Sequence, residues 1–422
     1  MGEKISKTCS FPVLIFFAVF FIAATIAFAS KKEREGRDLD EIKFWHSIGL
    51  YNKDVLNSLI TAFNENNRQT PVKGVFQGNE EDLYLKLFSQ EKLPDIVQVP
   101  VHLLPSLQEN GYIVDITPFI PDKIYEDIPE KIWKSVSIEN KTYGMPFSYN
   151  VGILFVNQHI IRISGVRQDE IPMSWEKIAA IAGKIKKNSR GKWGLYIPLE
   201  TTAQFISFTQ SYTGRPVIEN GKIEINTGEV IGAMRFLQQL VYKDKIMPAK
   251  ITVDEGEGLF LSGNLGIMLA SSLKLVHTES KLPYDLNVWN LPGGKETAPT
   301  IEGTCLAILA SDPKREKDAF KFVEYLVDYE NAIKWHTHTG SPSIKTSVKK
   351  SFDLLIFYED NPNHMTSAID LEKGEVFNPA SGFSNVDNII KKALEEIMIN
   401  GEDPEDILNI AQTEIDKLDL VY

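Results

Sequence analysis

Short apolar runs alternate with amphipathic segments in the first part of the chain beyond residue 40. The runs are short, β-branched or aromatic, and bounded by turn residues, which predicts strands, while the segments between them carry apolar residues at helical spacing. In chain order the predicted elements are strand 42–47, helix 52–64, strand 72–76, helix 81–90, strand 95–99 and helix 101–110. Strand and helix in alternation predict a parallel sheet wrapped by helices.

The alternation resumes after residue 157. The predicted strands are 194–198, 265–270, 286–289 and 304–310. The predicted helices are 175–187 with Ser174 as cap, 203–212, 229–241, 258–262, 314–327, 331–339, 385–400 and 403–418, with an irregular helical stretch at 348–365. Asn220 and Gly221 predict a tight hairpin turn.

The stretch 141–157 separates these two patterns. Gly144 and Pro146 interrupt regular structure, the polar patch 148–150 follows, and the apolar run 153–156 predicts a buried strand. A strand that opens on a breaker and a polar patch is a natural place for the chain to leave one lobe and enter another. We therefore expect 148–150 on the hinge side of a cleft.

Length and charge narrow the class of protein. A chain of 422 residues is long for one core, and 43% hydrophobic with 24% charged residues is an ordinary globular composition. The net charge of -12 argues against nucleic-acid binding.

The N-terminal end carries a localisation signal. Lys4 and Lys7 precede the apolar run 11–29, which ends in small residues and is followed by charged residues from 31. This predicts a signal peptide over 1–29 cleaved before Ser30, with an uncleaved anchor as the alternative. Either outcome places the remaining chain in the periplasm or another extracytoplasmic space.

Motifs of catalysis and metal binding are missing from the sequence. There is no G-x-S-x-G, H-E-x-x-H, Walker or G-x-G-x-x-G pattern. His336 and His338 are two residues apart, which on a helix turns them about 200° from each other, so no metal site and no cofactor is predicted. With only Cys9 and Cys305, no intrachain disulfide is expected.

Polar breaks after apolar strands are the remaining candidate chemistry. In a two-lobed α/β fold such strand ends converge on one cleft and offer hydroxyl, amide and backbone N–H groups. The predicted ligand-binding residues are Trp45, His46, Ser47, Asn79, Glu80, Ser148, Tyr149, Asn150, Ser271, Ser272, Trp289, Gly303, Thr304 and Ser341. The rings of Trp45, Tyr149 and Trp289 are candidate platforms for a sugar or head group, with core packing as the alternative.

An ordered set of sequence anchors extends from about Glu41 to the C-terminus. They are Phe44-Trp45-His46-Ser47, Leu59 to Asn64, Leu93-Pro94-Asp95-Ile96-Val97, Tyr143 to Phe147 with Leu154 to Asn157, Ser174-Trp175-Glu176, Phe260 to Met268, and Ala319 to Leu326 with Trp335 and Thr339-Gly340. In this order the anchors resemble the extracellular solute-binding proteins of bacterial ABC importers, family 1, a group that binds sugars and glycerol-3-phosphate.

The resemblance implies an α/β, two-lobed periplasmic-binding-protein fold with an interlobe hinge and a ligand cleft. It implies an N-terminal lobe of 40–149 and 300–350, and a C-terminal lobe of 150–299 and 351–422. The expected function is capture of a sugar or glycerol-phosphate-type solute by a non-enzymatic monomer, with ABC permease subunits as partners. Two alternatives remain: a membrane-anchored sensor of the same fold, and an extracytoplasmic hydrolase using Glu80 or Glu302 as acid or base.

The glycerol-3-phosphate-binding branch is the most similar in its local motifs, including Trp45-His46-Ser47 and Ala270-Ser271-Ser272. The sequence departs from that branch where Glu80 replaces an aromatic residue, and where the arginine expected to contact phosphate falls near Ala380 or Ser381. A phosphate dianion needs compensating charge or several N–H donors. A sugar, or a glycerophosphodiester with a cationic head group, fits these departures better than free glycerol-3-phosphate.

Overall fold

A computed structural model describes residues 41–49, 52–89, 92–167, 174–199, 201–219, 222–293, 299–377 and 383–418 of the protein. The predicted leader 1–29, the turn at Asn220 and Gly221, and the positions of Ala380 and Ser381 lie outside these ranges. None of the helices in the described ranges has the length and apolar character needed to cross a bilayer.

One mixed sheet extends through the molecule. Its strand order is β2-β1-β3-β12-β6-β10-β7, with β11 also beside β6 and β13 beside β12. The strands are β1 (Ile42–His46), β2 (Val72–Phe76), β3 (Ile96–Pro100), β6 (Met145–Asn157), β7 (Trp193–Tyr196), β10 (Leu265–Ser271), β11 (Leu286–Asn290), β12 (Thr300–Ile308) and β13 (Glu375–Val376). The predicted parallel pairing is present where β1 pairs with β2 and β3, whereas β6 is antiparallel to β10, β11 and β12.

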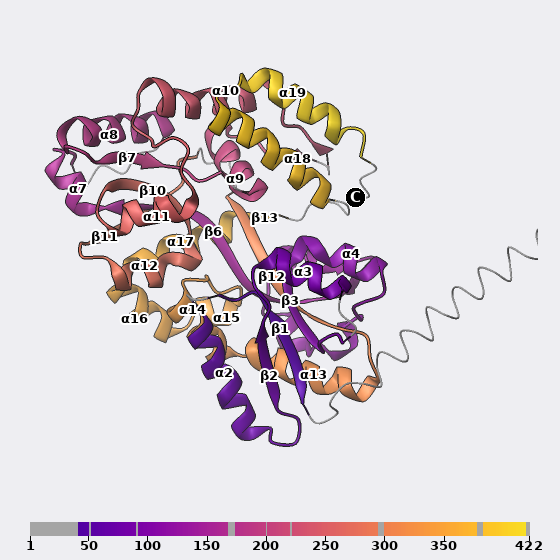
Figure 1. The fold of residues 1–422 in the computed structure, drawn as a ribbon. Coiled ribbons are helices and arrows are strands. Elements are labelled where there is room, and N and C mark those ends of the chain that lie inside the picture. The colour runs from indigo at the N-terminus through magenta and orange to yellow at the C-terminus, as the bar shows by residue number, and fades with distance from the viewer. Residues whose placement is uncertain are drawn as a thin grey trace, which may run out of the picture.

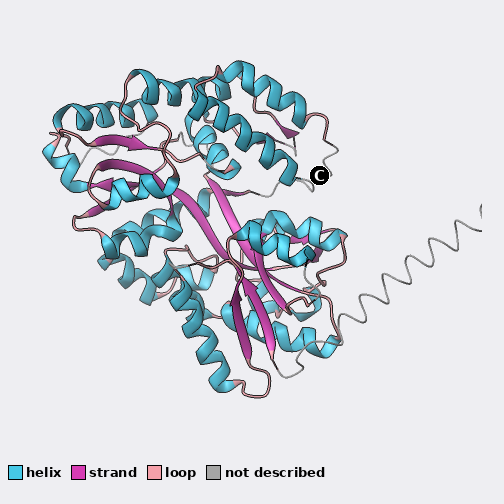
Figure 2. Ribbon diagram, in the orientation of Figure 1, coloured by secondary structure: helices cyan, strands magenta, loops and turns pink. Residues whose placement is uncertain are grey.

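Helices flank the strands on both sides (Figure 2). They are α2 (Lys53–Asn66), α3 (Glu80–Ser89), α4 (Leu104–Glu109), α5 (Asp122–Tyr125), α6 (Glu130–Lys134), α7 (Gln158–Ile163), α8 (Trp175–Asn188), α9 (Thr202–Thr213), α10 (Gly228–Gln238), α11 (Val253–Leu261), α12 (Leu275–Lys281), α13 (Pro313–Leu326), α14 (Tyr329–Thr339), α15 (Thr346–Lys349), α16 (Phe352–Asp360), α17 (Pro362–Lys373), α18 (Phe383–Glu395) and α19 (Pro404–Ile415). The sequence pattern had not indicated α5, α6, α7 or α12, which are short.

Two lobes lie at opposite ends of the diagonal strands β6 and β12 (Figure 1). In one lobe, Phe322 of α13 contacts Phe44 and Phe63, with ring centroids 5.7 and 5.0 Å apart. In the other, Trp175 of α8 meets Phe208 of α9 edge-on at 4.9 Å. The predicted two-lobed α/β fold is therefore confirmed, while the exact lobe boundaries stay a prediction.

A buried ion pair attaches α13 to the sheet of the first lobe. Arg315 Nε lies 2.5 Å from Asp95 Oδ1, and Arg315 Nη2 lies 2.7 Å from Asp95 Oδ2. The same carboxylate accepts the Lys43 N–H at 2.8 Å. Both partners are almost inaccessible to solvent, so this bidentate pair joins a helix and two strands far apart in sequence.

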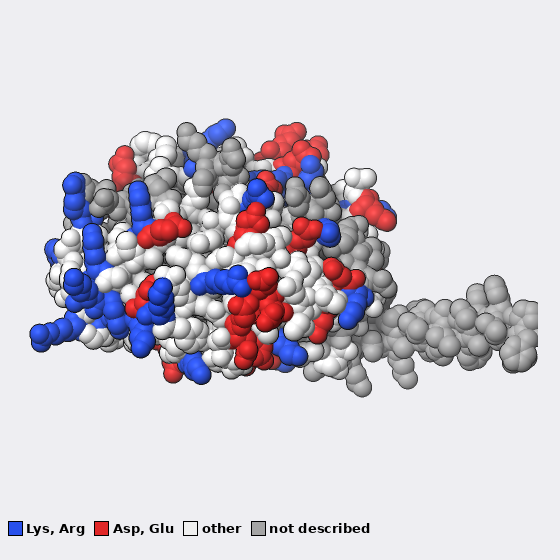
Figure 3. Space-filling view, turned by 90° about the horizontal axis from the view of Figure 1, so that it is seen from above, with Lys and Arg blue, Asp and Glu red and all other residues white. Residues whose placement is uncertain are grey.

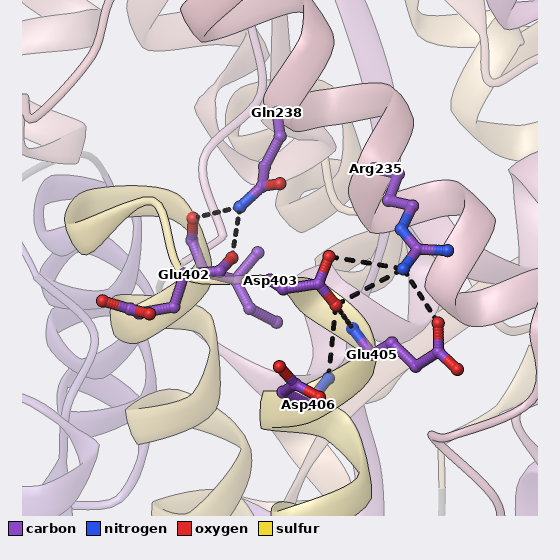
Figure 4. A network of polar contacts seen from close by, with 7 residues as sticks. Arg235, Gln238, Glu402, Asp403, Glu405 and Asp406 are labelled. Carbon is purple, nitrogen blue, oxygen red and sulfur yellow. Dashed lines mark hydrogen bonds and ion pairs between the residues drawn. The ribbon is translucent and has the colours of Figure 1, made fainter.

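The C-terminal helices α18 and α19 pack on the second lobe. Arg235 of α10 reaches Asp403 and Glu405 at the start of α19, and Gln238 donates to the Ile397 and Glu402 carbonyls (Figure 4). Asp403 also caps α19 by accepting its first backbone N–H groups. These contacts hold the start of α19 against α10.

The strand β6 differs from its prediction in length. It begins at Met145 and contains the polar patch 148–150, which we had placed before the strand. Its register with β12 skips Phe147, since Thr304 pairs with Ser148 and Cys305 with Pro146. This bulge accommodates a proline, which has no N–H to give to the ladder.

Candidate functional site

Part of one edge of β6 has no neighbouring strand, and side chains supply the hydrogen-bond partners that its backbone needs there. β10 pairs with β6 only from Gly152 onward. At Tyr149, the backbone N–H donates to Ser341 Oγ at 3.2 Å, and Ser341 Oγ donates to the Tyr149 carbonyl at 2.9 Å. Ser148 Oγ donates to the same hydroxyl at 3.1 Å. One serine thus takes the place of a neighbouring strand at the interlobe crossing.

Further contacts hold this arrangement in place. Trp335 Nε1 donates to Ser148 Oγ at 3.2 Å, and His336 Nδ1 lies 2.7 Å from the Ser341 carbonyl. Burial lowers the pKa of His336 to about 4, so its ring is neutral at physiological pH. Two residues beyond Tyr149 along the strand, the Val151 N–H donates to Ser272 Oγ at 3.4 Å.

These contacts change the interpretation of three predicted ligand-binding residues. Ser148, Ser272 and Ser341 are 6%, 0% and 2% exposed, and their hydroxyls are engaged within the crossing. A polar break after a strand was the signal that selected them, and here that signal reflects a backbone edge that needs partners. We therefore leave them out of the proposed solute-contacting set.

The three predicted aromatic platforms are buried. Tyr149 is 0% exposed and shares a hydrogen bond with Ser135 at 3.1 Å, while Trp45 and Trp289 are 8% and 3% exposed. Gly303 lies against the Tyr149 ring, because a Cβ at that glycine would approach the ring to 2.4 Å. The structure favours core packing, the alternative reading, for these rings and for Gly303.

The loop after β1 offers a mixture of buried and accessible groups. His46 is 3% exposed, and burial lowers the pKa of its imidazole to about 4. Ser47 is partly exposed, and both its N–H and its hydroxyl lie 3.1 Å from Gln98 Oε1. Gln98 of β3 therefore positions Ser47, a contact between neighbouring strands that no sequence motif indicated.

Two carboxyl groups of the candidate site, Glu80 and Glu302, are close enough for one to act on the pKa of the other. Glu80 begins α3, and burial together with the neighbouring Glu302 raises its pKa to about 7. Burial also raises the pKa of Glu302, against a hydrogen bond from Asn150. Glu80 is exposed, so its carboxyl is accessible to a solute although neighbouring groups desolvate it.

Asn150 connects this acidic pair to the second lobe. It pairs with Glu302 in the β6–β12 register, and its Oδ1 accepts a hydrogen bond from Ser271 Oγ at 2.9 Å. Ser271 ends β10 and stays partly exposed. The structure therefore places Asn150 between Ser271 and the carboxyl pair of Glu302 and Glu80, while a role of these residues in binding stays a prediction.

The other two predicted residues lie at the edge of this group. Asn79 is exposed and caps α3, since its Oδ1 accepts the Asp82 N–H at 2.8 Å. Thr304 is partly exposed, and its hydroxyl points to the Ser148 carbonyl at 3.3 Å. Both keep accessible surface for a solute.

His102 is a candidate contact that the sequence reasoning missed. It follows β3 directly, in the position of the other strand-end residues, and its ring lies 6.1 Å from Phe377 and 6.4 Å from Phe383. Burial lowers its pKa to about 4, against the opposing effect of Asp387 on α18. His102 therefore places a neutral ring where the two lobes approach each other.

Two lobes joined by crossing strands, with accessible polar groups gathered around the crossing, define a binding protein of the hinged, two-lobed class. A family model described as bacterial extracellular solute-binding protein matches residues 58–366. The chain belongs to this family. Its members are substrate-binding proteins.

Relatives and solved structures agree with the family. The sn-glycerol-3-phosphate-binding periplasmic protein UgpB of Escherichia coli (strain K12) is 24% identical over 387 residues, covering 82% of this chain and 84% of the relative. UgpB of Yersinia pestis is 24% identical over 370 residues, covering 81% of each chain.

Among solved structures, UgpB from Mycobacterium tuberculosis in complex with glycerophosphocholine superposes with a TM-score of 0.81 at 17% identity, covering 89% of this chain and 97% of that one. Maltose-bound MalE3 of T. maritima gives 0.77 at 19% identity, covering 89% and 99%. At these identities the structures show the shared fold.

Proposed function

We propose that this protein is the extracytoplasmic solute-binding component of an ABC importer. It captures a sugar or glycerol-phosphate-type solute between its lobes, closes by a hinge at the β6–β12 crossing, and delivers the solute to membrane permease subunits. The family, the periplasmic UgpB relatives and the two-lobed fold support this proposal.

We infer the class of solute from the charge of the acidic pair, Glu80 and Glu302. Burial raises the pKa of both carboxyl groups, and Glu302 raises that of Glu80 further; once ionised, the pair would repel a phosphate dianion. A cationic group between them would relieve the repulsion and favour ionisation of both. We therefore infer a glycerophosphodiester with a cationic head group, such as glycerophosphocholine, in preference to glycerol-3-phosphate. A neutral sugar is the second candidate, because Asn79, Asn150 and Ser271 offer amide and hydroxyl partners.

The proposed contacts come from both sides of the crossing. The accessible members of the predicted set are Ser47, Asn79, Glu80, Asn150, Ser271 and Thr304, to which we add His102 and Glu302. The lobe boundaries at 149–150, 299–300 and 350–351 are part of the same proposal.

Binding without turnover is the expected activity. Glu302 acts on the pKa of Glu80, and a second carboxyl group near Glu80 is what the hydrolase alternative requires. However, the family consists of binding proteins, and a pair of this kind equally serves to select a cation. A sensor held by an uncleaved anchor would use the same cleft, so neighbouring permease genes or a receptor kinase would separate transport from sensing.

Isothermal titration calorimetry with glycerophosphocholine, glycerol-3-phosphate and maltose tests the proposal. We expect glycerophosphocholine to bind tightest, and Glu80→Gln to weaken it about ten-fold, the effect of one partly exposed charge pair. Affinity should rise as pH increases through about 7, because the cation favours ionised Glu80. The matched control is Glu81→Gln, which alters an exposed carboxyl one position away on α3.

Three results would count against parts of this proposal. Preferential binding of glycerol-3-phosphate would refute the cationic head group. Maltose binding that is insensitive to Glu80→Gln would move the assignment to sugars. Release of glycerol or choline from glycerophosphocholine during the titration, followed by NMR, would support the hydrolase.

A further inference from the structure

A cavity lies in the second lobe, beside β10. It has a volume of about 400 Å³ and lies between α11 and α12, over β10. Its lining residues are Glu257, Phe260, Leu261, Met268, Lys274, His277, Thr278 and Lys281. None of the fourteen predicted ligand-binding residues lines it, so it is separate from the proposed solute site.

Basic side chains form one wall of this cavity. Lys274, His277 and Lys281 are spaced by three and four residues, so they lie along one face of the α12 segment. Glu257 of α11 forms an ion pair with Lys274. One carboxylate against two ammonium groups leaves the cavity with a net positive charge at neutral pH.

The positive potential of the lysines also acts on the imidazole of His277, which lines the cavity. Burial lowers the pKa of His277, and Lys281 and Lys274 lower it further. Elsewhere on this lobe, Lys and Arg side chains gather on the upper face of the molecule toward the side on which α7 and α8 lie (Figure 3). In a chain of net charge -12, such a local excess of positive charge attracts anions.

The floor of the cavity is apolar. Phe260 and Met268 are 0% and 4% exposed and belong to the hydrophobic core, and Leu261 is partly exposed beside them. Leu261 is the one of these three residues that solvent reaches, and a small inorganic anion would leave it in contact with water. A ligand that has both an anionic group and a short hydrocarbon body would use both parts of the cavity.

We propose that the α11–α12 cavity binds a small amphipathic organic anion, with its carboxylate or phosphate at Lys274 and Lys281 and its apolar body against Leu261 at the apolar floor. Occupancy of this site is independent of solute capture at the crossing strands. The cavity volume lies within the ~300–1,000 Å³ range of small-molecule sites. It therefore suits a ligand whose hydrocarbon chain is of medium length.

Titration calorimetry of the purified protein with octanoate tests the site. Octanoate should bind saturably with one molecule per chain, octanamide at least about ten-fold more weakly, and acetate without saturation, because charge and apolar contact are both required. Lys281→Ala should weaken octanoate about five-fold or more, as expected for loss of one partly exposed charge contact. Lys184→Ala, an exposed lysine on α8, is the matched control and should change nothing.

Independent readouts separate this site from the solute cleft. In NMR titrations, octanoate should shift the His277 imidazole signals and raise its pKa, because an anion offsets the two lysines. Lys281→Ala should leave glycerophosphocholine binding unchanged. The proposal is overturned if octanoate and octanamide bind alike, if Lys281→Ala has no effect on octanoate, or if octanoate competes with glycerophosphocholine.

Discussion

Ser341→Ala tests whether a single hydroxyl completes the edge of the interlobe strand. In the native protein this hydroxyl accepts the Tyr149 N–H and the Ser148 hydroxyl, and it donates to the Tyr149 carbonyl. Alanine preserves the backbone of the segment after α14 and removes only the oxygen. Since Ser341 is 2% exposed and Tyr149 is 0% exposed, water cannot easily replace it.

The expected cost follows from the groups left without partners. A buried polar group that loses its hydrogen bond costs about 1–3 kcal/mol. The N–H and the carbonyl of Tyr149 both lose a partner, and the Ser148 hydroxyl can still accept from Trp335. We therefore expect Ser341→Ala to lower the free energy of unfolding by about 2–4 kcal/mol.

Urea unfolding followed by tryptophan fluorescence measures this change through the midpoint of the transition. Ser280→Ala is the control, because its hydroxyl makes one exposed hydrogen bond at the end of α12, and it should cost less than about 0.5 kcal/mol. A loss below about 1 kcal/mol for Ser341→Ala would refute the reasoning and show that other groups satisfy this edge of β6.

Three further substitutions test separate features. Gly303→Ala should destabilise the protein by about 2 kcal/mol in urea unfolding, because its new Cβ would collide with the buried Tyr149 ring. Arg315→Met should cost about 3–5 kcal/mol in the same assay, because it leaves the buried Asp95 carboxylate unpaired. Glu80→Gln should raise the melting temperature of the ligand-free protein at pH 8 and leave it unchanged at pH 4, since folding raises the pKa of this carboxyl from 4.5 to about 7 and stability is lost as it ionises.

Each of these has a matched control on the same or a comparable element. Gly232→Ala adds a methyl group in open space on α10 and should be neutral or slightly stabilising. Lys314→Met changes an exposed cation one residue before Arg315. Glu81→Gln should leave the melting temperature unchanged at both pH values; an equal rise in Glu81→Gln and Glu80→Gln would contradict a specific effect of Glu302.

Periodicity located most regular elements because each element buries one face, and burial leaves a trace in the order of residues. The alternation over 42–110 predicted β1, β2 and β3 with the helices between them, and Gly340 marked the end of α14 in a left-handed conformation at φ 79°. The ordered anchors were sufficient for the family and the two-lobed fold. Short elements such as α5 and β13 leave too few positions for a pattern to appear.

The sequence by itself determined the fold class and the place where the chain first crosses between the lobes. The roles of the polar residues at that crossing depended on distant partners. Ser341 lies 192 residues from Tyr149 in the chain, and Glu302 is likewise far from Glu80. Only the tertiary structure decided that the Ser341 hydroxyl bonds to the backbone of β6 and that Glu302 acts on the pKa of Glu80. Local sequence fixes a residue's chemistry, but packing fixes its neighbours.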